Sequence, residues 1–230
     1  MLTWLAYSLY DHVIDEKTDI LNVPIANILS RTAQDTYRKS GVRPEDISKI
    51  FTITDTANIQ EIITTIYNST DQKLLLPERS IAHITGPLHI ATLIDRRYYS
   101  KVYKALSYYC AARQLNDDLH DWVEDLHAGR ITYVTSLLIE ESDIDPSSLT
   151  LNRLTFLLKR QFFETTLSRC LNEIIELCHK SRSILESTIL KEGSEFNGRF
   201  IRPIEDSAEK ALIVHKKNYE LVQHLKKISS

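Results

Sequence analysis

The chain has 230 residues, 43% of them hydrophobic, so it can bury a sizeable core, and we expect a single domain over residues 1–230. Its 28 basic and 31 acidic residues leave a net charge of -3, which gives no overall reason to expect binding to nucleic acid or to a membrane surface. No apolar run reaches the roughly 18 residues of a transmembrane segment, and three cysteines without CxxC spacing indicate a reducing compartment, so we expect a cytoplasmic protein.

Helical periodicity dominates the sequence. Five glycines and six prolines interrupt it, and the segments between them carry apolar residues at three- and four-residue spacing. This spacing predicts an all-α fold. In chain order, the expected helices cover residues 3–16, 24–40, 55–69, 77–94, 98–127, 150–192 with a possible break, and 203–227.

Glycine and proline at two places indicate where these helices end or bend. Gly129 follows the fifth expected helix, where a glycine commonly forms the C-terminal cap. Gly86-Pro87 lies inside the fourth, where the missing proline N–H should kink or break the helix. A packing kink is the plain interpretation, and freed carbonyl groups facing a cavity are the functional one.

The first expected helix ends in an acidic motif, YDHVIDE. Asp11 and Asp15 stand four residues apart, so both point the same way from adjacent turns, with Glu16 beside them. Like charges at this spacing repel, and a bound cation would explain the pair. The alternative is a solvated acidic helix end.

The fifth expected helix carries a denser acidic motif, QLNDDLHDWVEDLHAGR. Its acids recur at four-residue spacing and are flanked by others, and these candidate metal ligands are Asp117, Asp118, Asp121 and Asp125, with Glu124 nearby. They alternate with apolar residues, so this helix is expected to pack in the domain. A solvated acidic face is again the alternative.

Two acidic helices suit magnesium chemistry. Mg2+ prefers oxygen ligands and usually binds through one or two carboxylates together with substrate phosphates and water. Carboxylates from opposite walls of a cavity would hold such ions around one diphosphate. The ions would stabilise the negative charge that develops as an allylic carbon–oxygen bond breaks, while apolar walls exclude water.

These motifs resemble those of the class I isoprenoid synthases, which include squalene and phytoene synthases and trans-prenyl diphosphate synthases. The second motif is similar to the squalene and phytoene synthase pattern, in which Gln-Leu precedes the Asp-x-x-x-Asp matched by Asp121 and Asp125, followed by Gly-Arg. It also resembles the trans-prenyltransferase pattern, in which Gln precedes Asp-Asp-x-x-Asp, through Gln114, Asp117, Asp118 and Asp121.

The first motif resembles the squalene and phytoene branch, because Asp11-x-x-x-Asp15-Glu16 follows Tyr7, whereas His12 stands where prenyltransferases have a second aspartate. The resemblance covers roughly residues 5 to 135. It implies a helical bundle around a central cavity. Family members have helices before the first motif, and the motif here begins ten residues from Met1, so we expect a domain that is shortened at its N-terminus.

Basic residues near the acidic motifs are candidates for diphosphate contact. Arg79 opens the fourth expected helix, and Arg113 and Arg130 flank the second motif. Surface ion pairs are the alternative for each. The histidines, including His83, lack HExxH spacing or cysteine partners, so we expect no zinc site.

The sequence therefore predicts a magnesium-dependent transferase acting on prenyl diphosphates. The catalytic ligands would be Asp11, Asp15, Asp117, Asp121 and Asp125. Head-to-head coupling is slightly preferred over chain elongation, and cyclisation comes third. The competing hypothesis is a non-catalytic or incomplete synthase-like protein that binds an isoprenoid or a partner subunit, and the family resemblance also suggests a homodimer.

Overall fold

The computed structural model describes residues 2–15, 20–63, 69–142, 144, 149–187 and 195–228. Within these ranges the chain is helical and contains no strand, which confirms the all-α prediction. No helix in the described part of the chain is both long enough and apolar enough to cross a membrane.

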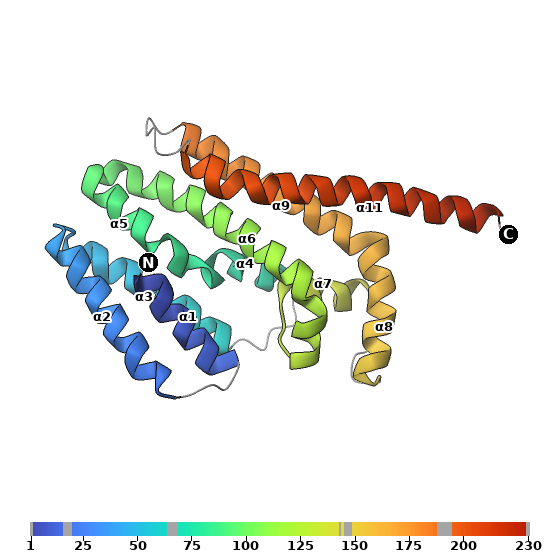
Figure 1. The fold of residues 1–230 in the computed structure, drawn as a ribbon, viewed down its shortest axis with the longest axis horizontal. Helices are drawn as coiled ribbons and strands as arrows, with labels where there is room; N and C mark the ends of the chain where they lie inside the picture. Colours follow the sequence, from blue (N-terminus) through green and yellow to red (C-terminus); the bar gives the residue numbers. More distant parts are fainter. Residues whose placement is uncertain are drawn as a thin grey trace.

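The N-terminal half forms layers of helices around a long central one (Figure 1). The α-helices here are α1 (Leu2–Asp15), α2 (Asn22–Lys39), α3 (Pro44–Ile63), α4 (Ser69–Arg79), α5 (Thr85–Ile94) and α6 (Tyr99–Ala128). Two short 3-10 segments separate the last three, η1 (Ile81–Ile84) and η2 (Arg96–Tyr98). Helices α1 and α2 pair in antiparallel fashion, and α6 packs against α4.

The C-terminal half consists of α7 (Tyr133–Glu141), α8 (Leu151–Gln161), α9 (Leu167–Glu186) and α11 (Arg202–Ile228). Short π-helical segments precede the last two, η4 (Phe162–Thr166) and η5 (Asn197–Ile201). Helix α9 packs along α6 and carries α11 on its other side, so the chain ends on a helix that extends well past the body (Figure 1).

Helix α6 lies at the centre of the core. Its fully buried side chains include Ala105, Ala112 and Leu115, and the same apolar cluster takes in residues from α3 through α11. The three cysteines are free and buried in helices, and Cys110 lies on α6 itself. They act as small apolar residues, as their spacing indicated.

Several predicted helix limits are confirmed, and others are wrong for identifiable reasons. Helix α3 begins at Pro44 instead of residue 55, because proline at the first helical position followed by acidic residues is a strong helix start. Helix α7 was not predicted, although Thr132 caps its first turn by accepting a hydrogen bond from the Thr135 N–H. Over the described residues 151–186 the chain stays helical through η4, so the break expected within 150–192 is a π-helical turn and not an interruption of the helix.

The predicted helix over 77–94 is wrong in a way that affects the site. The interruption lies at Ser80 and η1, before Gly86-Pro87. Pro87 stands in the first turn of α5, where its missing N–H would have had no helical partner, so it does not kink the helix. A kink at Gly86-Pro87 is therefore not observed.

The C-terminal cap of α6 is testable. Gly129 has a φ of 72°, the left-handed region, which costs residues with a Cβ about 1–2 kcal/mol. We expect Gly129→Ala to lower the free energy of unfolding by about that amount in urea titrations. Gly198→Ala is the matched control, because Gly198 also has open space around its Cβ position but no positive φ. Equal destabilisation by both substitutions would contradict the assignment.

Candidate functional site

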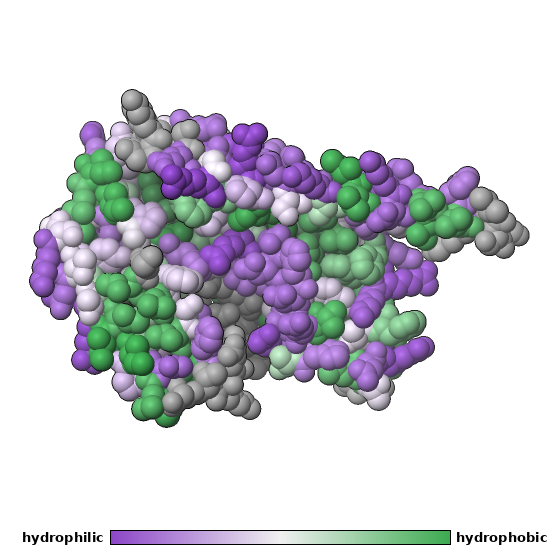
Figure 2. Space-filling model, viewed as in Figure 1, coloured by the Kyte–Doolittle hydropathy of each residue, from purple (hydrophilic) through white to green (hydrophobic). Residues whose placement is uncertain are grey.

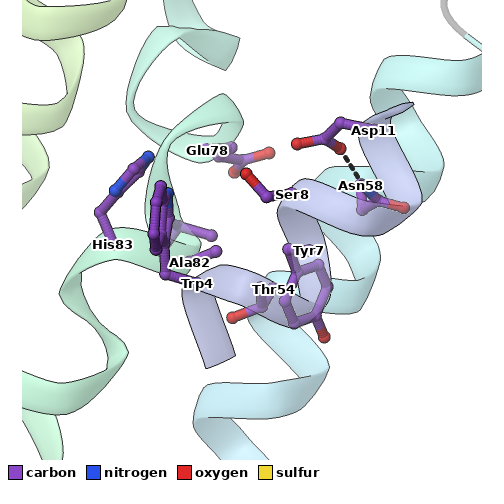
Figure 3. Close-up of a pocket in the computed structure, with 10 residues that line it drawn as sticks. Trp4, Tyr7, Ser8, Asp11, Thr54, Asn58, Glu78, Ala82 and His83 are labelled. Atoms are coloured by element: carbon purple, nitrogen blue, oxygen red, sulfur yellow. Dashed lines mark hydrogen bonds between the residues drawn. The ribbon is translucent and has the colours of Figure 1, made fainter. Parts of the chain in front are cut away.

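The first acidic motif occupies the last turns of α1. Asp11 is exposed, and its Oδ1 accepts a hydrogen bond from Asn58 Nδ2 on α3 at 3.2 Å (Figure 3). The side chain of Asp15 and all of Glu16 lie outside the described residues. The metal-ligand role of Asp15 therefore stays a prediction.

The second acidic motif does not present all its carboxylates on one face of α6. Leu115, Leu119 and Trp122 define the buried stripe of the helix. Asp118 and Asp125 lie beside this stripe and are buried, whereas Asp117 and Asp121 lie outside it and are exposed. The helical rotation of about 100° per residue thus divides the motif into a buried pair and an exposed pair.

The buried pair is engaged within the fold. Gln114 Nε2 donates to Asp118 Oδ1 at 2.8 Å, and Ser80 Oγ donates to Gln114 Oε1 at 3.0 Å. Because a buried carboxylate is costly without hydrogen bonds, this chain of contacts stabilises Asp118 and also fixes the α4–η1 break against α6.

Asp125 is engaged by a residue that was predicted to bind diphosphate. Arg130 Nε donates to Asp125 Oδ1 at 2.9 Å, and the Arg130 backbone N–H donates to the Asp125 carbonyl at 2.8 Å. This arrangement places a cation at the C-terminus of α6, where it also interacts favourably with the helix dipole. In this structure, therefore, Arg130 contacts its own helix end.

A small polar cavity lies between α1, α3, α4 and η1 (Figure 3). Its volume is about 50 Å³. Asp11, Ser8 and Glu78 point toward one another at one side, and Trp4 lies beside His83 at the other, with ring centroids 5.8 Å apart. The full lining comprises Trp4, Tyr7, Ser8, Asp11, Thr54, Asn58, Glu78, Ile81, Ala82 and His83.

Arg113 connects this cavity to the second motif. Its Nη1 donates to the His83 ring at 2.9 Å, and its Nε lies 3.9 Å from Asp117 Oδ2. His83 lines the same cavity as Asp11. A chain of contacts through His83 and Arg113 therefore runs from the cavity that Asp11 lines to Asp117 on α6, and we call the cavity and this chain the α1–α6 site.

Burial is the main influence on the pKa values of the ionisable groups at the α1–α6 site. Burial and the neighbouring Arg113 cation lower the pKa of His83 to about 4. Partial burial raises the pKa of Asp117, an effect that Arg113 opposes. Burial also raises the pKa of Glu78 and of Tyr7, whose hydroxyl donates a hydrogen bond to Asp55. At neutral pH His83 is uncharged and accepts from Arg113.

Sequence reasoning missed several polar residues at this site. Asn58, Glu78 and His83 belong to no motif, and they reach the site only because α3 and the α4–η1 break pack next to α1. The one available signal was the break itself, which the sequence analysis placed at Gly86-Pro87 instead. The side chain of Arg79 lies outside the described residues, so its role stays a prediction.

One group of potential metal ligands lies elsewhere. Among the described residues, His179, Glu205 and Glu209 place ligand atoms within 4.8 Å of one another, between α9 and α11. Glu205 is buried, and its carboxylate already accepts from Arg182 and lies 2.6 Å from His179 Nε2. The Glu205 carboxylate is thus already occupied by Arg182 and His179 of α9, and these contacts hold α11 on α9.

Comparison with known proteins identifies no matching family model, no matching curated protein and no matching solved structure.

The state of His83 is testable by NMR titration of its imidazole. We expect a pKa near 4, and a higher value in Arg113→Gln, because a neighbouring cation is removed. The unfolded chain takes up a proton below about pH 6.5 that the folded His83 does not accept. His83 therefore makes the free energy of unfolding fall as the pH drops from about 6.5 toward 4.

The control for this titration is Arg153→Gln, which removes a cation from α8 that faces the Phe156 ring. It is expected to leave the His83 pKa unchanged. An unchanged His83 pKa in Arg113→Gln would show that burial alone sets the protonation state.

Proposed function

We propose that this chain is a magnesium-dependent, prenyl diphosphate-processing transferase of the isoprenoid synthase type. One observation carries the proposal: Asp11 of the first motif lines a cavity together with His83, and Arg113 contacts both His83 and Asp117 of the second motif. The proposal includes the fold that the family resemblance implies, a bundle of helices around a central cavity.

The donor chemistry at the site fits magnesium. Asp11, Asp117 and Asp121 are exposed carboxylates on two different helices, and carboxylate oxygen is the ligand type that this ion prefers. The buried Asp118 and Asp125 are committed to Gln114 and Arg130. We therefore assign the ligand role to the exposed carboxylates first. Bound magnesium would neutralise diphosphate charge and stabilise the leaving group.

Arg113 is the residue best placed to contact a diphosphate. Its guanidinium carries five N–H donors, and the contacts to His83 and Asp117 use only part of them. Neutral His83 orients the guanidinium without competing for its charge. A diphosphate between α1 and α6 would then meet a fixed cation as well as the metal-binding carboxylates.

Head-to-head coupling remains the preferred reaction, because the first motif is similar to that of squalene and phytoene synthases. In such a step the allylic carbon–oxygen bond breaks, and both electrons leave with the diphosphate. The alkene of the second substrate then forms a carbon–carbon bond to the allylic cation, and a proton is lost. Chain elongation uses the same ionisation with a different acceptor.

A second candidate function has its own observation. The cavity at the α1–α6 site measures about 50 Å³, whereas pockets that enclose a small organic ligand measure about 300–1,000 Å³. This volume suits a phosphate group or hydrated ion better than a prenyl chain. It favours a non-catalytic protein that holds the diphosphate end of an isoprenoid and leaves the chain to another surface or subunit.

The test is calorimetric titration of farnesyl diphosphate into the purified chain, with magnesium and with EDTA. We expect binding with magnesium alone, because the carboxylates repel an uncompensated diphosphate. Asp121→Asn should weaken this binding about tenfold or more, whereas Glu176→Gln on α9, which removes a carboxylate paired with Lys180, should not. Equal effects of the two substitutions would contradict the metal assignment.

A product assay separates the candidate functions. Turnover of farnesyl diphosphate alone supports coupling, and turnover only with isopentenyl diphosphate supports elongation. Magnesium-dependent binding without either product supports the non-catalytic protein. Absence of binding in both conditions would exclude the α1–α6 site as a diphosphate site.

A further inference from the structure

Helix α11 packs against the body of the protein through one stripe of its surface. Ile201 just before it, and then Glu205, Ala208 and Leu212, are buried against the body. Among the described side chains Leu212 is the last buried one, and the helix continues to Ile228, with its end projecting past the body (Figure 1).

A second apolar stripe begins where the first ends. Ala211, Val214, Asn218, Leu221 and Leu225 alternate at spacings of three and four residues, and Ile228 continues the sequence pattern. This is the a/d spacing of a coiled-coil heptad. We call these positions the α11 seam.

The α11 seam is exposed. The fractional exposure is 57% for Val214, 58% for Leu221 and 54% for Leu225, and Figure 2 shows hydrophobic residues in green on the projecting end of the helix. At about 100° per residue, the seam lies roughly a third of a turn away from the buried stripe, so packing against α9 does not cover it.

An apolar groove runs beside the α11 seam. It has a volume of about 630 Å³ and lies between α11 and the segment formed by α8, η4 and the start of α9. Phe163 and Leu167 form one wall, and Ala211, Val214 and Asn218 form the other. Both walls of the groove are apolar, and one of them carries the heptad spacing. Grooves of this kind bind the apolar face of an amphipathic helix.

Charge identifies the kind of helix that fits. The g positions that flank the seam are Lys210, Lys217 and His224, and the e positions are His215 and Val222, so no acidic residue flanks it. A parallel second copy would bring Lys210 toward His215, and an antiparallel copy would bring lysines together. Both pairings lack the opposite charges that stabilise coiled coils, whereas acidic residues at the e and g positions of another helix would supply them.

We propose that the groove and the α11 seam dock an amphipathic helix of another protein, with apolar a and d positions, a polar residue opposite Asn218 and acidic flanks. Asn218 fixes the register, because an asparagine at an a position pairs best with another polar group. The opposite wall adds little net charge, since Arg160 and Glu164 are hydrogen-bonded to each other at 3.0 Å. The proposal is independent of the α1–α6 site.

The experiment uses two synthetic peptides of three heptads with leucine at a and d and one asparagine at a. One carries glutamate at every e and g position and the other carries lysine. Glutamate repulsion keeps the first peptide from pairing with itself. Fluorescence anisotropy with the full chain is expected to show binding of the glutamate peptide at least about tenfold tighter than binding of the lysine peptide.

Variants locate the binding surface. Leu221→Asp combined with Leu225→Asp should abolish binding of the glutamate peptide. Ile213→Asp is the matched control, because Ile213 is 54% exposed on the same helix but lies off the seam. Lys210→Glu combined with Lys217→Glu should reverse the preference toward the lysine peptide. All these positions are exposed, and circular dichroism checks that each variant keeps its helix content.

Three results would overturn the proposal. These are no preference between the peptides, loss of binding in Ile213→Asp equal to that in the seam variant, and sedimentation of the chain as a dimer that the seam variant dissociates. The last result would assign the surface to a second copy of this chain.

Discussion

The arrangement of this protein depends on one constraint in α6. This helix buries its apolar face in the core, yet it carries five acidic residues within nine positions. Burying Leu115, Leu119 and Trp122 forces two neighbouring aspartates into the core with them. A buried carboxylate is tolerated only with hydrogen bonds, and the fold supplies these from Gln114 and Arg130. The remaining acids are left at the surface. Chemistry at α6 is therefore restricted by packing before any ligand is considered.

The interruption between α4 and α5 connects the buried part of α6 to the rest of the site. Because the helix stops at Ser80, a 3-10 turn can place Ser80 on Gln114 and His83 on Arg113 at the same time. Side chains three residues apart in a 3-10 turn nearly eclipse one another, so Ser80 and His83 both face α6. The break thus links the buried part of the second motif to the cavity that Asp11 lines.

Much of the fold was predictable from local patterns, and the site was predictable only in part. The long helix α6, its Gly129 cap and the final helix follow from apolar spacing and cap chemistry, which act over a few residues. The pairing of Arg130 with Asp125 and the approach of His83 to Arg113 depend on packing, and the second joins residues 30 apart. Spacing identified the acidic residues and their rotation around α6, but it could not identify Gln114 and Arg130 as the partners of the buried pair.

Helix α11 shows why periodicity alone does not assign a face. Its apolar residues fit two stripes, and only the packing on α9 shows that the fold uses one of them. Glu205 secures that choice through Arg182 and His179, so the helix is held at a fixed angle and its other stripe is presented in a defined direction. A binding surface that is already ordered loses little conformational entropy when a partner docks. The ion pairs that hold α11 therefore also favour recognition along its exposed side.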